Sequence, residues 1–227
     1  MAFRKKARFV LAHQPDLLIV QECEHPDRLH FDENLPKPTN CLWYGENKHK
    51  GMAILSYGNC RIKEEANHNP VFRTIVPVKV TVNRSSLLLF AIWAFNPTDK
   101  NAVYIEQVWK AIDHYENFLK NKKTILAGDF NSNAIWDRKH RISNHSNVVK
   151  RLSEKGIHSV YHSHFKQLQG HEFHPTFYFY RHKDKPYHLD YCFASADLIK
   201  KMDHVEVGSY EHWSPYSDHM PLIVTFR

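Results

Sequence analysis

The chain has 227 residues, 42% of them hydrophobic and 24% charged, which argues against a disordered or fibrous protein and predicts one folded domain over residues 1–227. The 31 basic and 24 acidic residues give a formal net charge of +7, which favours an acidic partner, nucleic acid before other phosphorylated molecules. The four cysteines form no CxxC pair, and no secretory or long apolar segment is present. These absences argue against a zinc knuckle or redox dithiol and predict a cytoplasmic protein without a membrane partner.

The first part of the chain predicts one helix and four strands. A helix over residues 3–12 is expected to bury Phe3 and to carry Lys6 on its opposite, basic face. Residues 25–50 are rich in Pro, Asn, Asp and His, and therefore predict a surface excursion rather than core. The expected strands are DLLIVQE, MAILSY, FRTIVPVKVTV and SLLLFAIWAF.

The second part predicts two helices and five strands. Apolar residues recur at helical spacing over residues 105–119, and Thr98 or Asp99 can cap this helix. A shorter helix over 146–155 ends at Gly156. The expected strands are KTILAGDFN, PTFYFY, YHLDYCF, HVEVGSY and PLIVTF. A strand–helix–strand order followed by pairs of strands predicts an α+β fold, a four-layer αββα sandwich.

Carboxylates recur where expected strands end. Glu22 closes DLLIVQE, Asp129 closes TILAGD, Asp190 lies in HLDYCFAS, and Asp218-His219 precedes the last strand. A carboxylate inside or just after a buried apolar strand is costly unless it is paired or binds a metal. This pattern, repeated four times, predicts a metal-dependent hydrolytic site built from strand ends.

The segments that carry these residues resemble the endonuclease/exonuclease/phosphatase superfamily, which includes deoxyribonuclease I and exonuclease III. The resemblance covers nearly the whole chain, in the family's order and strand context, and implies the DNase I-like αββα sandwich. The matching segments are Gln21-Glu22, Gly128-Asp129-Phe130-Asn131, Leu189-Asp190-Tyr191 and Ser217-Asp218-His219.

Phosphodiester hydrolysis explains the residue types of the site. Mg²⁺ takes carboxylate oxygens and keeps several waters, so Glu22, with Asp218 in support, is the expected metal ligand, and Mn²⁺ is the alternative ion. Asp129 is expected to orient and deprotonate the attacking water, and Asn131 to donate its amide to the phosphate.

The resemblance implies that His219 donates a hydrogen bond to a phosphate oxygen. Asp190 is expected to orient His219 and to raise its basicity, as in other carboxylate–histidine pairs. The histidines as a group carry less information. Most of the 18 lie in polar stretches such as KHRISNHSN and are expected to be solvated, so a histidine-rich zinc protein rests on composition alone.

Three further contacts are expected around this centre. The resemblance implies a phosphate contact at Asn96, but Phe95 stands near the place of a family tyrosine, which argues against abasic-site cleavage. Thr176-Phe177 resembles a Thr-Trp segment that shapes the substrate groove. Arg181 lies in an interleaved aromatic and basic stretch, which either stacks bases and holds phosphates or forms a packing strand and a solvated turn.

The front of the chain departs from the family pattern. Family members begin with a strand that ends in an asparagine, whereas this chain begins with the expected helix. Either the sequence starts at an internal methionine of a longer protein, the alternative favoured here, or the protein functions without that strand.

The leading hypothesis is a divalent-metal-dependent phosphodiesterase, a nuclease acting on DNA in preference to RNA. Two alternatives stay open: hydrolysis of a phosphoester outside nucleic acid, and a non-catalytic nucleic-acid-binding protein weakened by the missing strand. Endonucleolytic or exonucleolytic cutting and the oligomeric state are not specified by the sequence.

Overall fold

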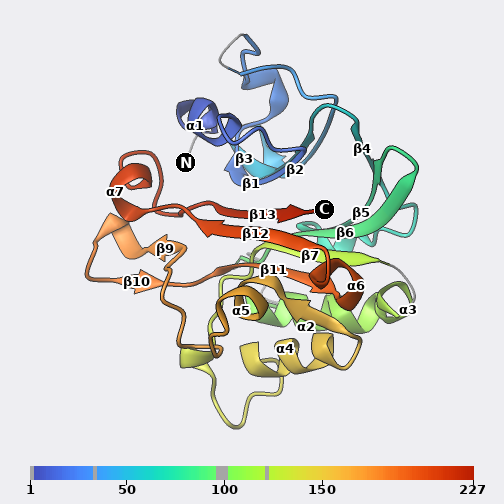
Figure 1. Ribbon diagram of the computed structural model, residues 1–227, viewed down its shortest axis with the longest axis vertical. Coiled ribbons are helices and arrows are strands. Elements are labelled where there is room, and N and C mark those ends of the chain that lie inside the picture. Colours follow the sequence, from blue (N-terminus) through green and yellow to red (C-terminus); the bar gives the residue numbers. More distant parts are fainter. Residues whose placement is uncertain (1–2, 33–34, 96–101, 121–122) are drawn as a thin grey trace.

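A six-stranded sheet forms the centre of the structure, a computed structural model that describes residues 3–32, 35–95, 102–120 and 123–227 (Figure 1). In spatial order its strands are β4 (Cys60–Glu64), β5 (Ile75–Val82), β6 (Ser85–Trp93), β7 (Thr124–Asp129), β11 (Asp190–Ser195) and β8 (Ile157–Ser159). The neighbours are antiparallel except for β6 and β7, which are parallel. Parallel neighbours need a crossover connection, and α2 (Ile105–His114) and α3 (Glu116–Leu119) provide it.

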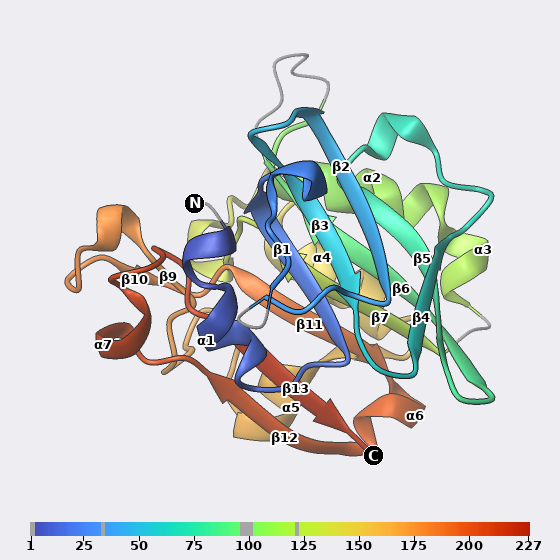
Figure 2. The same cartoon turned by 90° about the horizontal axis from the view of Figure 1, so that it is seen from above.

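A second β layer packs on the central sheet (Figure 2). Side chains of both layers, such as Ile54, Val78 and Val205, form one buried cluster between them. The second layer contains the antiparallel sheet β1 (Leu17–Cys23), β3 (Lys50–Ser56) and β2 (Asn40–Asn47), in that order, and the antiparallel pair β12 (Met202–Val207) and β13 (Leu222–Phe226). The short strands β9 (Phe177–Tyr178) and β10 (Pro186–Tyr187) form a separate hairpin.

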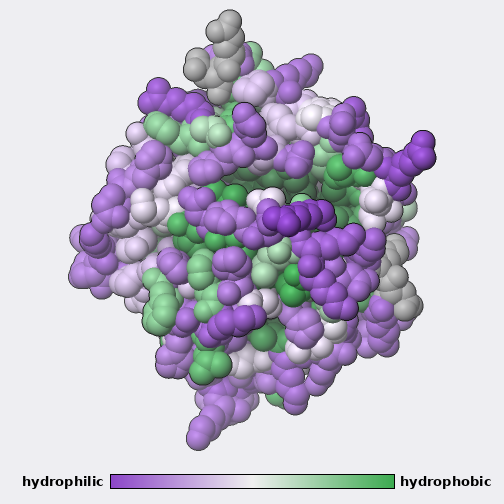
Figure 3. Space-filling view, in the orientation of Figure 1, coloured by the Kyte–Doolittle hydropathy of each residue, from purple (hydrophilic) through white to green (hydrophobic). Residues whose placement is uncertain are grey.

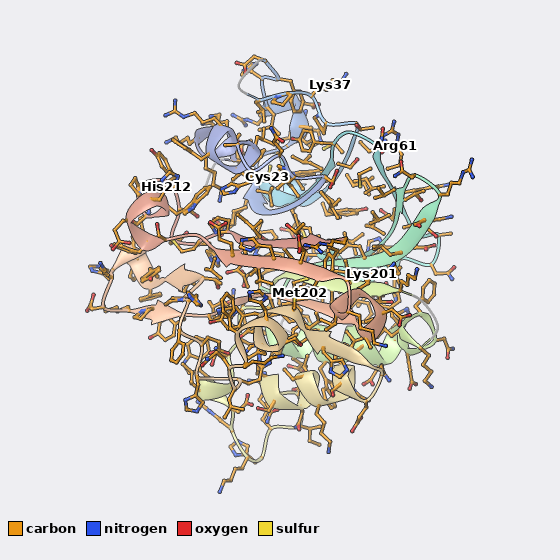
Figure 4. All side chains as sticks on the ribbon, viewed as in Figure 1. Cys23, Lys37, Arg61, Lys201, Met202 and His212 are labelled. Atoms are coloured by element: carbon orange, nitrogen blue, oxygen red, sulfur yellow. The ribbon has the colours of Figure 1, made fainter. Side chains whose placement is uncertain are left out.

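Helices cover the outer faces of the two β layers. On the central sheet, α2, α3 and α4 (His145–Ser153) bury side chains such as Ile112 and Leu152. On the other side, η1 (Phe3–Lys5) and α1 (Ala7–Leu11) bury Phe3 against β1, where Cys23 lies beneath α1 (Figure 4). The predicted α+β sandwich of four layers is confirmed.

The remaining helices are one or two turns long. None of the described helices has the length and apolar character needed to cross a bilayer. They are η2 (Pro26–Arg28), η3 (Pro70–Phe72), η4 (Ala134–Trp136), α5 (Val160–Phe165), η5 (Phe179–Arg181), α6 (Ala196–Ile199) and α7 (Tyr210–Trp213).

The prediction that residues 25–50 form only a surface excursion is wrong. They contain β2, an edge strand, and Leu29 and Leu35 are buried in the cluster under α1. The Trp43 ring lies over Gly45 and Gly51, where a Cβ would come within 2.3 and 2.4 Å of it. Glycine and polar residues interrupt the apolar pattern of this strand, so periodicity alone does not reveal it.

Two other predicted elements are shorter than expected. The helix over 105–119 divides at the buried Tyr115, whose hydroxyl accepts a hydrogen bond from the Asn69 amide at 2.8 Å. Its N-cap is Tyr104, and the caps predicted at Thr98 and Asp99 lie outside the described residues. PTFYFY contributes only the two-residue β9, because Tyr180 has a left-handed φ of 52° and ends the strand.

The strand that the resemblance implies before the first helix is not among the described residues. Within them, β1 pairs only with β3 and β13 only with β12. Leu17 of β1 and Val224 of β13 pack on the same cluster, and Figure 3 shows hydrophobic side chains across the middle of this face. The first described elements are η1 and α1, and Lys6 between them lines the cavity described below.

Candidate active site

The ends of two neighbouring strands bring the predicted catalytic carboxylates together. Asp129 ends β7, Asp190 begins β11, and the two are direct partners in the antiparallel register. His219 forms an isolated bridge with Phe177 and reaches Asp190 with its side chain. Segments far apart in the sequence thus meet where β7 ends and β11 begins.

Gly128 permits the close strand packing at this edge. Its φ is +134°, and a Cβ at this position would lie 2.0 Å from the Ile92 carbonyl oxygen of β6. The same oxygen accepts a hydrogen bond from Gln21 Nε2 of β1 at 3.1 Å. Only glycine adopts this positive φ and allows this close approach of β6 without strain, so the glycine before Asp129 in the motif has a steric basis.

Asp190 and His219 form a hydrogen-bonded ion pair. His219 Nδ1 lies 2.9 Å from Asp190 Oδ2. Burial opposes the charged imidazolium, but the carboxylates of Asp190, Asp129 and Asp218 outweigh it and raise the pKa of His219 to about 9. His219 is therefore a cation at neutral pH, and its Nε2 can donate to a phosphate oxygen.

Asp129 is a buried carboxylate with a raised pKa. Asp129 is only 3% exposed, and its Oδ1 accepts a hydrogen bond from the backbone amide of Asn131 at 2.8 Å. Burial first, and then the negative charge of Asp190, raise the pKa of Asp129 to about 7. A carboxylate of that pKa can take a proton from water near neutral pH, as a general base requires.

Glu22 reaches the site from β1 through an irregularity in the strand. The β1–β3 register shifts between Val20 and Cys23, and Glu22 has a left-handed φ of 56°. Its Oε1 lies 2.6 Å from Lys50 Nζ. Burial would raise the pKa of Glu22, but hydrogen bonds, that of Lys50 foremost, lower it to about 2, so the group is an anion.

One cavity of about 990 Å³ is lined by Glu22, Asp129 and His219, whereas Asp190 is not a lining residue and adjoins it through its contact with His219. Glu22 and Asp218 both line it, and their oxygens are the donor type that Mg²⁺ takes. No group of three or more metal-ligating side chains occurs in the described parts of the chain, but Mg²⁺ needs only one or two carboxylates beside waters. The residues present therefore fit a hydrated Mg²⁺ or Mn²⁺. The other predicted site residues that line the cavity are Asp129, Asn131 and His219.

The contacts predicted outside this centre have different outcomes. Asn96 lies outside the described residues, and the neighbouring Phe95 lines the cavity. Phe177 also lines it, with its ring centroid 4.7 Å from that of His219. Arg181 is not among the lining residues, and its Nη1 donates to the Pro215 carbonyl at 3.3 Å.

Two lysines of the cavity wall were not predicted as site residues. Lys50 pairs with Glu22, and Lys6, expected on the outer basic face of the first helix, lines the cavity instead. The sequence contains no signal for either, since an isolated lysine on a polar face resembles any solvated charge. Ser217, by contrast, belongs to the Ser-Asp-His segment and lines the cavity with its neighbours.

Thr176 holds the backbone that carries Asp190. It is fully buried, and its Oγ1 accepts hydrogen bonds from the amides of Leu189 and Asp190, both at 2.9 Å. We expect Thr176→Val to leave both amides without that acceptor, to destabilise the fold by about 1–3 kcal/mol and to lower the cleavage rate. Thermal melting and initial rates measure the two effects. Thr176→Ser keeps the hydroxyl as the control, and wild-type melting and rates in the valine variant would refute the role.

A buried polar network supports the loop after Asp129. The Asn133 side-chain amide donates to Glu172 Oε2 at 3.1 Å and to the His188 carbonyl at 3.0 Å, and Glu172 Oε1 lies 3.0 Å from His162 Nε2. The expectation that histidines in polar stretches are solvated is wrong for His145, which is 1% exposed, and His188 of the expected strand YHLDYCF is 3% exposed. Their burial depends on partners distant in sequence, such as Ser132 Oγ, 2.8 Å from His145 Nδ1.

Comparison with known proteins finds structural likeness without sequence likeness. No family model and no curated protein matches the sequence. The endonuclease domain of TRAS1, a telomere-specific non-LTR retrotransposon, has a TM-score of 0.66 at 17% identity, covering 100% of this chain and 96% of that one. The 3'-5' exonuclease NExo from Neisseria meningitidis has a TM-score of 0.65 at 20% identity, covering 99% and 96%. An AP endonuclease from Archaeoglobus fulgidus has 0.69 at 17%, covering 99% and 95%.

These likenesses extend over the full described sandwich. At 20% identity or less they establish the fold alone, and that fold is DNase I-like. The fold implied by the strand-end motifs is thereby confirmed. What the chain acts on depends on its own site, because this fold serves several phosphoester chemistries.

Proposed function

We propose that this protein is a divalent-metal-dependent nuclease that hydrolyses phosphodiester bonds of DNA. The observation that carries the proposal is the convergence of a buried carboxylate, an aspartate–histidine pair and an anionic glutamate at one cavity, through Asp129, Asp190–His219 and Glu22. The structural neighbours include an exonuclease and an AP endonuclease, and one is described with a product DNA hairpin. The net charge of +7 suits the same partner.

The residues divide the work of hydrolysis. Asp129 orients a water molecule and accepts its proton as the water oxygen attacks phosphorus. His219, held by Asp190, donates a hydrogen bond to a phosphate oxygen, and Asn131 donates its side-chain amide. Glu22 and Asp218 would hold the Mg²⁺ or Mn²⁺ ion, which when bound neutralises phosphate charge and stabilises the leaving oxygen.

The charge distribution of the cavity supports phosphate binding with a metal present. Its wall carries Lys6, Lys50 and Arg73 beside the carboxylates. Arg73 pairs with Glu46 of β2 and Lys50 with Glu22, so the acidic groups are partly neutralised within the protein. Metal held by Glu22 would complete this neutralisation, because unscreened carboxylates repel a phosphodiester.

Cleavage of labelled single- and double-stranded DNA tests the proposal. We expect product release with Mg²⁺ or Mn²⁺, loss of it on addition of EDTA, and recovery when metal is restored, because metal neutralises the phosphate. Asp129→Ala is expected to abolish cutting in every metal. DNA binding that survives EDTA without any hydrolysis would identify a binding protein instead, and hydrolysis confined to small phosphoesters would move the substrate outside nucleic acid.

A further inference from the structure

We propose that Lys6 is a substrate-contacting residue of this site, with its ammonium group placed to bind the scissile phosphate. The inference rests on the proposed function and adds a residue to it. Lys6 lines the same cavity as Asp129 and His219. Its Nζ lies 3.4 Å from Ser217 Oγ, 211 positions later in the sequence.

The surroundings of the Lys6 ammonium are those of the catalytic centre. The carboxylates that act on it come from three separate segments, Asp218 and Asp190 more strongly than Glu22. Burial lowers the pKa of Lys6, and these carboxylates oppose that change. The side chain of Lys6 therefore lies in the same cavity wall as the carboxylates that a phosphate must approach.

The backbone around Lys6 is firmly anchored. On one side, the Phe3 amide donates to Glu24 Oε2 at 2.6 Å and the Arg4 guanidinium to Glu24 Oε1 at 2.8 Å. On the other side, Ala7 is 1% exposed against β1, and the Phe9 ring lies 4.3 Å from that of Tyr216. Lys6 stands between η1 and α1, so both anchors fix its direction into the cavity.

The chemistry of an ammonium group fits a phosphate contact. It offers three donors as a compact positive charge, whereas the neighbouring carboxylates offer only acceptors. Because Asp129 is already assigned to orient and deprotonate the water, a phosphate oxygen is the ligand that fits the Lys6 donor. Lys6 thus adds, from the turn that precedes α1, a positive donor next to Ser217 and beside that of His219.

Lys6→Ala compared with Lys5→Ala tests this role. Lys5 is the preceding residue, exposed on η1, so both variants remove one positive charge at nearly the same place. We expect Lys6→Ala to lower kcat/KM by about 10- to 100-fold, the usual worth of one hydrogen bond to a charged group, and Lys5→Ala to stay within about twofold of the wild type. Lys6→Arg is expected to recover part of the loss.

Binding separates this role from structural support and from the proposed function. Affinity for a phosphorothioate oligonucleotide, measured in EDTA by fluorescence anisotropy, is expected to fall about tenfold or more in Lys6→Ala but not in Lys5→Ala, at equal melting temperatures. If Lys6→Ala melts lower, Lys6→Gln, which keeps the chain length and a donor, replaces it. Rates and affinities of the Lys6 variant that match those of Lys5→Ala would overturn the Lys6 proposal while wild-type cutting leaves the nuclease standing. A wild type that cuts no DNA would overturn the nuclease, and the binding comparison would then decide the role of Lys6.

Discussion

Asp129→Asn is expected to lower kcat by about a thousandfold, in the range of measured general-base contributions, while the protein stays folded. The asparagine keeps an oxygen for the Asn131 amide but cannot accept a proton from water. Single-turnover cleavage with saturating metal measures the chemical step directly. Cutting within tenfold of the wild type would assign the base to another group.

The same substitution is expected to stabilise the fold at alkaline pH. The pKa of Asp129 is raised from 3.8 to about 7, so the folded protein holds the proton more tightly than the unfolded chain does. The stability that this proton contributes is complete below about pH 4 and is lost as the pH rises toward 7. At 1.36 kcal/mol per pKa unit the upper limit is about 4 kcal/mol, or several degrees in Tm.

Melting of both proteins at pH 5 and pH 8, in EDTA, tests this linkage. Asp129→Asn should gain more over the wild type at pH 8 than at pH 5. The cleavage rate of the wild type should rise as the pH increases through about 7, because only the ionised carboxylate acts as a base. An equal difference in Tm at the two pH values would contradict the buried, protonated state of Asp129.

His219→Ala is expected to reduce kcat by about 100- to 1,000-fold, since it removes a charged donor to the phosphate. Asp190→Asn should cost a comparable factor, because it leaves His219 without the carboxylate that holds its charge. The 2.9 Å contact between them makes the two effects dependent. The double variant should therefore have a kcat only slightly below that of the less active single variant.

A double-mutant cycle in kcat/KM measures that dependence. Lys185→Ala, which changes an exposed residue between η5 and β10, serves as a matched surface control in combination with either variant. Its effect should add to that of His219→Ala. Full additivity between Asp190 and His219 would show that they act separately and would remove the positioning role of Asp190.

The sequence by itself determined the fold class and which residues form the centre of the candidate site. Apolar runs that end in a carboxylate predicted both strands and strand ends, and Asp129, Asp190 and His219 indeed meet there. Such residues can be identified from sequence because burying an anion is costly, so a carboxylate within an apolar strand indicates a site that pairs it or binds a metal. The four motifs in order added the family resemblance, and the structure confirmed the fold that the resemblance implies.

Only the tertiary structure decided which cations and supports surround that centre. An uninterrupted helix over residues 3–12 would carry Lys6 on its polar face, but the chain changes from η1 to α1 at this residue, and anchoring through Glu24 directs Lys6 inward. Thr176 became a support for Asp190 only because β9 and β11 place their ends together. Burial of His145 likewise depends on partners distant in sequence. Strand β2 packs the Trp43 ring over Gly45 and Gly51, a contact that periodicity does not indicate. These features arise from long-range packing, which local periodicity does not encode.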